Sequence, residues 1–115
     1  ASAIQLGSKG SYSSIIGTNP MFMQKFYAAA AAARWDEAFQ MQKFLAKFFV
    51  QLGELIGRLG EGDPDPVIDK AMAVASGFLK AHQRCRPPYI GWSDKNIIAL
   101  RQWMQENYPE LIYAE

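Results

Sequence analysis

The segment from Leu6 to Pro20 constrains the fold more than any other part of this chain, because it is the one stretch with the pattern of a β-strand. Within it, small and apolar residues alternate from Ser11 to Ile16, and the pair Ile15-Ile16 has strong strand preference. Almost everything that follows is typical of helix. Since a lone strand cannot satisfy its own backbone donors and acceptors, we expect it to complete a sheet or barrel with other polypeptide.

The helices expected after this strand are marked by capping and stop signals. Asn19 is placed as an N-cap ahead of Pro20, the pair Asp65-Pro66 repeats this device, and Gly77 is a helix stop. Asp36 is expected to cap a long apolar helix, and Ser93 opens the last one. We therefore expect helices over about residues 20–33, 37–57, 66–76 and 93–108, with a loop over 57–66 and a peripheral C-terminal tail.

Composition excludes several classes of protein. With 115 residues and 50% hydrophobic content, the chain can bury a core as one domain. The balance of 12 Lys+Arg against 11 Asp+Glu argues against a general nucleic-acid or anionic-membrane surface. Lys43, Lys47 and Glu54 interrupt the best apolar run, so no bilayer-spanning segment is expected.

The cell compartment is expected to be a reducing one. Cys85 is the sole cysteine, so no intrachain disulfide can form, which fits a cytoplasmic protein. Residues 1–6 lack the basic and long apolar regions of a signal peptide and resemble the last turn of a helix that stops at Gly7. We therefore predict a cytoplasmic protein.

The usual constellations of catalytic or metal-binding residues are missing. His82 is the only histidine, so we expect no histidine-rich metal site and place this residue on the surface. Cys85 lies between arginines that could lower a thiol pKa, which leaves a thiol sensor as an alternative, but no histidine base stands at a defined spacing. Asp63 and Asp65 flank proline and are interpreted as turn and cap residues rather than a cation site.

Lys9 and the serines after it need separate treatment. A lysine amine can form a Schiff base, but Lys9 precedes the expected strand, on the side opposite to the catalytic face of a parallel barrel. Ser13, Ser14, Gly17 and Thr18 lie in the second half of the strand and the following loop, on the face that carries active sites. These small residues could border a ligand or simply fill a crowded barrel interior, and the residues alone do not decide between the two.

Several segments, in order and spacing, resemble one enzyme family. Leu6 through Pro20 resembles the eighth barrel strand and following loop of the dihydrodipicolinate synthase/N-acetylneuraminate lyase family. The likeness continues in a small-residue helix end followed by a short corner, Ala31-Ala32-Ala33-Arg34-Trp35-Asp36-Glu37-Ala38. Three later motifs also match, namely Asp65-Pro66 with Lys70-Ala71 and Gly77, Arg86-Pro87-Pro88, and Ser93-Asp94. These proteins are Schiff-base-forming class I aldolases and lyases that handle pyruvate or related 2-oxo acids.

The resemblance implies an α/β fold of which this chain is a part. Residues 1–34 would be the last strand and helix of a (β/α)8 TIM barrel, and residues 35–115 a C-terminal helical bundle, so that this chain is mostly α. A complete barrel needs about 250 residues. The family's Schiff-base lysine, catalytic tyrosine and carboxylate-binding loop would lie upstream of Ala1, leaving no catalytic residue, metal ligand or cofactor site in this chain. The implied partners are the remainder of the barrel, a 2-oxo acid substrate and further copies in a dimer or tetramer.

Three residues are expected to border the substrate. Tyr12 matches the position whose main-chain carbonyl borders the 2-oxo acid pocket and is bulkier than the usual Ile or Val. Ser14 matches a position that contacts substrate in the neuraminate lyases, and Gly17 stands where the family often has Asn. The implied reaction is cleavage or formation of a carbon–carbon bond, or dehydration of a sugar acid. The alternative is a stand-alone helical interaction module, favoured by the wide apolar face over residues 44–59.

Overall fold

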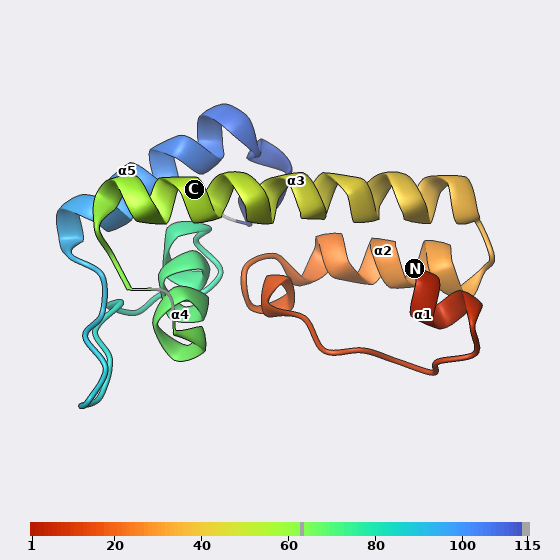
Figure 1. Ribbon diagram of the computed structural model, residues 1–115, viewed down its shortest axis with the longest axis horizontal. Coiled ribbons are helices and arrows are strands. Elements are labelled where there is room, and N and C mark those ends of the chain that lie inside the picture. Colours follow the sequence, from red (N-terminus) through yellow and green to blue (C-terminus); the bar gives the residue numbers. More distant parts are fainter. Residues whose placement is uncertain (63, 114–115) are drawn as a thin grey trace.

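The computed structural model describes residues 1–62 and 64–113 and is mostly α, with no β-strand among them. A long helix, α3 (Trp35–Leu59), runs along the molecule (Figure 1). The preceding helix, α2 (Pro20–Ala31), lies antiparallel beside it, so that the two form a helical hairpin. The remaining helices are α1 (Ser2–Gln5), α4 (Asp65–Ala75) and α5 (Asp94–Asn107), with short 3-10 helices η1 (Ser14–Gly17) and η2 (Pro109–Leu111).

Local signals at helix ends are confirmed at several positions. The side-chain oxygen of Asn19 accepts the backbone N–H of Phe22 at 3.2 Å, and Pro20 is the first residue of α2. Ser93 caps α5 in the same way, accepting the N–H of Asn96 at 3.3 Å. Gly77, just past α4, has φ +85°, a conformation that glycine adopts without strain.

Other boundary predictions are wrong by a few residues. Asp36 does not cap α3; it lies in the first turn, where a carboxylate still interacts favourably with the positive end of the helix dipole. Asp65 likewise lies in the first turn of α4. Helix α3 extends past residue 57 and ends only before Gly60, which has φ +70°. Asp63, predicted to be a turn residue, lies outside the described residues.

The predicted strand over residues 11–16 is wrong for this structure. Ser13 is extended (φ −153°, ψ 135°), but the chain then turns into η1, and the Ser13 hydroxyl accepts the Ile15 N–H at 3.2 Å. The Ile15 carbonyl accepts the N–H groups of Thr18 and Asn19 at 3.0 and 2.8 Å. With no second strand among the described residues, these groups are satisfied locally, and the Ile15 side chain is fully buried in the helical core.

One hydrophobic core draws residues from several helices of the chain. Phe48 of α3 is fully buried, and its ring lies 5.1 Å from Tyr108 and 5.8 Å from Trp103, measured between centroids. Phe22 of α2 joins the same cluster through Phe44, at 5.4 Å. Residues on both sides of position 34 therefore share a core. Burial raises the pKa of the Tyr108 hydroxyl, which donates to the side-chain oxygen of Gln51.

The C-terminal tail is part of the core rather than peripheral, contrary to expectation. Leu111 of η2 is fully buried. The amide of Asn19 donates to the carbonyl oxygens of Glu110 and Ile112 at 3.2 and 3.4 Å. The N–H of Tyr113 donates to the carbonyl of Ser76 at 2.9 Å. The tail thus connects the start of α2 to the end of α4.

Candidate functional site

The three predicted substrate residues lie on or near the segment that leads into η1. Residues 8–13 cross the molecule as an extended connection below α2, and η1 then lies against α4 (Figure 1). Tyr12 is fully exposed at 106% of its reference area, Ser14 is half-buried, and Gly17 is half-buried at the end of η1. The predicted residues therefore occupy the surface of one short stretch rather than the interior of a barrel.

A shallow hollow of about 360 Å³ brings two of the predicted residues together. Its walls are one side of this stretch and a single residue of α4, namely Ser11, Tyr12, Ser13, Ser14, Ile16 and Asp69. Gly17 does not line the hollow, so the grouping of all three predicted residues is not reproduced there. The hollow is polar, with hydroxyl groups on one wall and a carboxyl group on the other.

Asp69 is the residue that sequence reasoning missed. Its Oδ1 atom is buried and has no hydrogen-bond partner among the described residues. Asp69 shares one face of α4 with Met72 and Ser76, at helical spacings of three and seven residues, and both of those are fully buried. The signal was present as an acidic residue on the apolar face of a predicted helix, which is rare unless the charge has a partner.

Helix α4 is held against η1 at its other end. The Ser76 hydroxyl donates to the backbone carbonyl of Thr18 at 2.6 Å, in the interior. Thr18 itself is fully buried, and its own hydroxyl has no partner among the described residues. This contact fixes the distance between the two walls of the hollow, because it joins the end of η1 to the end of α4.

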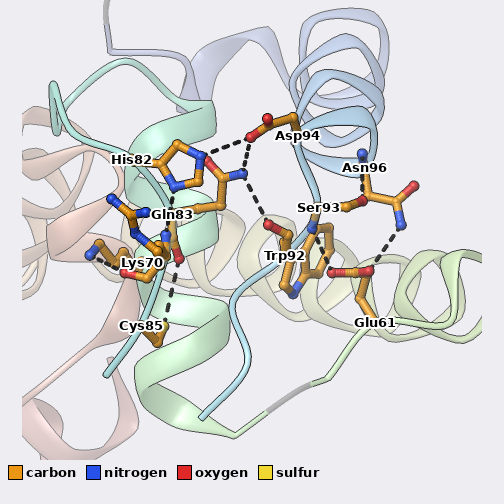
Figure 2. Close-up of polar contacts among 10 residues, drawn as sticks. Glu61, Lys70, His82, Gln83, Cys85, Trp92, Ser93, Asp94 and Asn96 are labelled. Atoms are coloured by element: carbon orange, nitrogen blue, oxygen red, sulfur yellow. Dashed lines mark hydrogen bonds and ion pairs between the residues drawn. The ribbon is translucent and has the colours of Figure 1, made fainter. Parts of the chain in front are cut away.

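A second polar cluster lies between the end of α4 and the start of α5 (Figure 2). His82 Nε2 lies 2.9 Å from Asp94 Oδ1, which also accepts from the Gln83 amide at 2.7 Å. The backbone N–H of Arg84 donates to His82 Nδ1 at 3.0 Å, so Nδ1 is unprotonated and Nε2 carries the hydrogen. The hydrogen bond from Gln83, which is the largest cause, and the hydrogen bond from His82 lower the pKa of Asp94.

This second cluster is a clamp on a loop rather than a catalytic dyad. Both ring nitrogens of His82 are engaged within the chain, so neither is available as a base. The Gln83 amide also donates to the Trp92 carbonyl at 3.0 Å. A Cβ at Gly91 would collide with the carbonyl oxygen of Gln83, so only glycine allows the two arms of this loop to approach so closely.

Further bonds tie the loop to the end of α3. The two carboxylate oxygens of Glu61 accept from the Ser93 N–H at 3.2 Å and from the Asn96 amide at 3.1 Å (Figure 2). The indole N–H of Trp92 donates to the carbonyl of Gly62 at 3.1 Å. The polar side chains of this cluster are thus bonded to one another or to the backbone, which favours the hollow beside Asp69 as the candidate functional site.

The remaining sequence candidates, Lys9, His82 and Cys85, lie outside the hollow. Lys9 is exposed and contributes its backbone carbonyl, which accepts from the Tyr27 hydroxyl at 2.9 Å. His82 has 52% of its side chain exposed, as expected. The Cys85 sulfur is half-buried and lies 3.6 Å from the carbonyl of Gln83.

The described residues include neither a cluster of metal-ligand side chains nor a helix suited to a membrane span. Across residues 1–62 and 64–113, no three His, Cys, Asp or Glu side chains gather as metal ligands do. In the same residues, no helix has both the length and the apolar character needed to cross a bilayer. Comparisons with protein-family models, with curated proteins and with solved structures find no match to this chain.

Proposed function

We propose that this chain is the C-terminal part of a Schiff-base-forming 2-oxo-acid lyase, aldolase or sugar-acid dehydratase. Residues 1–34 belong to the end of a (β/α)8 barrel and residues 35–115 to its helical appendage. The reactive lysine is supplied by polypeptide outside this chain, and the assembly is a cytoplasmic dimer or tetramer without a cofactor. The proposal is supported by the resemblance of several motifs to that family, in order along nearly the whole sequence.

The observation that carries the proposal is an unpaired stretch of extended backbone. From residue 9 to residue 13, the backbone N–H groups donate to no other described residue, and Tyr12 is fully exposed. Such a row of free donors is what a strand offers to a neighbouring strand. Further polypeptide could pair with this stretch, although η1 would have to extend for Ile15 and Ile16 to join the strand.

Borohydride trapping tests the proposal directly. The protein is isolated from its source cell, its intact mass is measured, and it is treated with pyruvate and borohydride before peptide mapping. We expect a pyruvyl adduct on a lysine outside the 115 residues described. No adduct would refute the lyase interpretation. An adduct on Lys9 would refute the placement of the nucleophile while leaving the chemistry intact.

A second candidate function is a stand-alone helical interaction module. It is favoured by the continuous core, to which α2, α3, α4 and α5 all contribute, and by apolar side chains left exposed on α3. Phe49 is 44% exposed and Val50 66%, on the turn beside the buried Phe48. This candidate predicts that the 115-residue chain alone unfolds in one cooperative transition. A chain that is molten or insoluble when expressed alone would count against it.

A further inference from the structure

The carboxyl group of Asp69 has no hydrogen-bond partner among the described residues to explain its position. Its Oδ1 atom is buried without a hydrogen bond among the described residues, on a helix face whose other members are apolar or bonded. Leaving a buried acceptor unpaired is costly, and more so when the group is charged. Asp69 as a whole is only partly buried and lines the hollow, so a ligand there would meet this residue, and completing the hydrogen bonds of Oδ1 requires its side chain to turn toward the ligand.

The rest of the hollow indicates what such a ligand must offer. Ser11 and Ser14 have hydroxyls without hydrogen bonds to any described residue, and Ser13 has a hydroxyl that accepts one N–H and can still donate. A carboxylate only accepts, whereas a serine hydroxyl both donates and accepts. The best complement is a group that also does both, which is a hydroxyl. No Lys or Arg lines the hollow, so it lacks the cation that would hold a carboxylate or phosphate.

Size and shape agree with a small hydroxylated ligand. The hollow has a volume of about 360 Å³, near the lower end of the range for small-molecule sites. Tyr12 lines the hollow and is fully exposed, and Ile16, 57% exposed, adds apolar surface. A chain of hydroxyl-bearing carbons has both polar groups for the serines and Asp69 and C–H faces for these side chains.

We propose that the hollow between residues 11–16 and α4 binds a neutral polyhydroxylated chain, with Asp69 as its anchoring acceptor. We identify this ligand with the hydroxyl-bearing end of a 2-oxo acid substrate, not with its carboxylate end, and this identification rests on the proposed function. The binding site itself follows from the hollow and from the unpaired oxygen of Asp69.

Titration with erythritol, a neutral four-carbon polyol that cannot form a Schiff base, tests the site. Amide NMR spectra of the isotope-labelled chain should show saturable shifts confined to residues 11–16 and to the surroundings of Asp69. Asp69→Asn should weaken binding by about tenfold or more, since a hydrogen bond to a charged acceptor is lost. Ser14→Ala should weaken it by roughly two- to tenfold.

Asp65→Asn is the matched control, because it makes the same change of charge at an exposed position of the same helix. It should leave erythritol binding unchanged. Asp69→Asn should also keep the native pattern of amide shifts, because Oδ1 has no bond within the described chain to lose.

Each other outcome has a definite meaning. An absence of saturable shifts, or equal binding by the Asp69 variant, overturns the proposed site. Tight, Asp69-dependent binding of putrescine without binding of erythritol overturns the ligand class in favour of a cation. Erythritol binding without any borohydride-trapped adduct keeps the site and refutes the lyase, whereas trapping without erythritol binding keeps the lyase and refutes the site.

Discussion

Two regions of α3 are packed in opposite ways. Near its start, α2 and α3 approach through alanines, and Ala29, Ala30 and Ala38 are the buried residues of a small cluster, the alanine end. Near its middle, Phe48 lies beside Trp103 and Tyr108 in an aromatic cluster. Small side chains bring two helices close but bury little area, whereas large rings bury much area and hold several elements together. We expect the aromatic cluster to be sensitive to removal of volume and the alanine end to its addition.

The largest effect is expected from Phe48→Ala. The side chain is fully buried and contacts rings from α5 and the residue after it, so its loss leaves a cavity that rigid neighbours cannot fill. The free energy of unfolding, measured with urea, should fall by about 3–5 kcal/mol. Val50→Ala on the exposed side of α3 is the control and should change it by about 0.5 kcal/mol or less. Equal effects of the two variants would show that the aromatic cluster is not the centre of stability.

The alanine end is tested by adding volume with Ala29→Leu. Ala29 of α2 is fully buried in the cluster with Ala38 of α3, so the larger side chain should cost about 1–3 kcal/mol of unfolding free energy. Ala30→Leu is the matched variant, because Ala30 lines an apolar cavity of about 210 Å³ that can receive the added carbons. We expect it to cost less, as measured by thermal and urea unfolding. A larger loss from Ala30→Leu would contradict this view of the alanine end.

Asn19→Ala tests how the start of α2 is joined to the C-terminal tail, which follows Tyr108 of the aromatic cluster. The substitution removes the N-cap of α2 and the two bonds to the tail, so the unfolding free energy should fall by about 1–2 kcal/mol. Ser93→Ala is the comparison, since it removes a cap without such a distant contact and should cost about 1 kcal/mol. Faster hydrogen exchange at residues 111–113 in the Asn19 variant alone would identify the tail contact. Equal exchange in both variants would assign the whole effect to capping.

The smallest effect concerns Asp94 at the start of α5, which belongs neither to the alanine end nor to the aromatic cluster. Its pKa is lowered in the folded state, so its contribution to stability is present above the ordinary value of 3.8 and is lost as the pH falls through the lower folded value. Asp94→Asn should therefore lower the stability slightly at neutral pH, leave it nearly unchanged at the lowest pH, and so flatten the acid side of the stability–pH curve. An Asp94→Asn variant whose stability falls as steeply with acid as that of the parent protein would contradict this role of Asp94.

Helix starts and stops could be predicted because the interactions that set them span only a few residues. The caps at Asn19 and Ser93 and the stop at Gly77 each depend on one side chain or one backbone angle close in sequence. The same reasoning misassigned Ile15 and Ile16, because strand preference describes a residue on a paired surface and the described chain offers no such surface. Ile15 is buried, but in a helical core, and Ile16 is exposed.

The candidate site was only half predictable for the same reason. Tyr12 and Ser14 were expected near a ligand, and both line the hollow. Asp69, more than fifty residues further along the chain, reaches the same hollow only because Ser76 and Thr18 hold α4 against η1. No spacing in the sequence encodes that meeting, since it depends on how two distant elements pack.

The sequence by itself determined where most helices begin, how long the apolar face of α3 is, and that no run of residues suits a membrane span. Only the tertiary structure decided that the stretch before η1 stays unpaired, that the tail is buried at Leu111, and that Asp69 faces serines. The physical reason is the distance along the chain over which each interaction acts. Caps and helical periodicity act over one or two turns, whereas strand pairing and core contacts depend on partners that only the folded chain brings together.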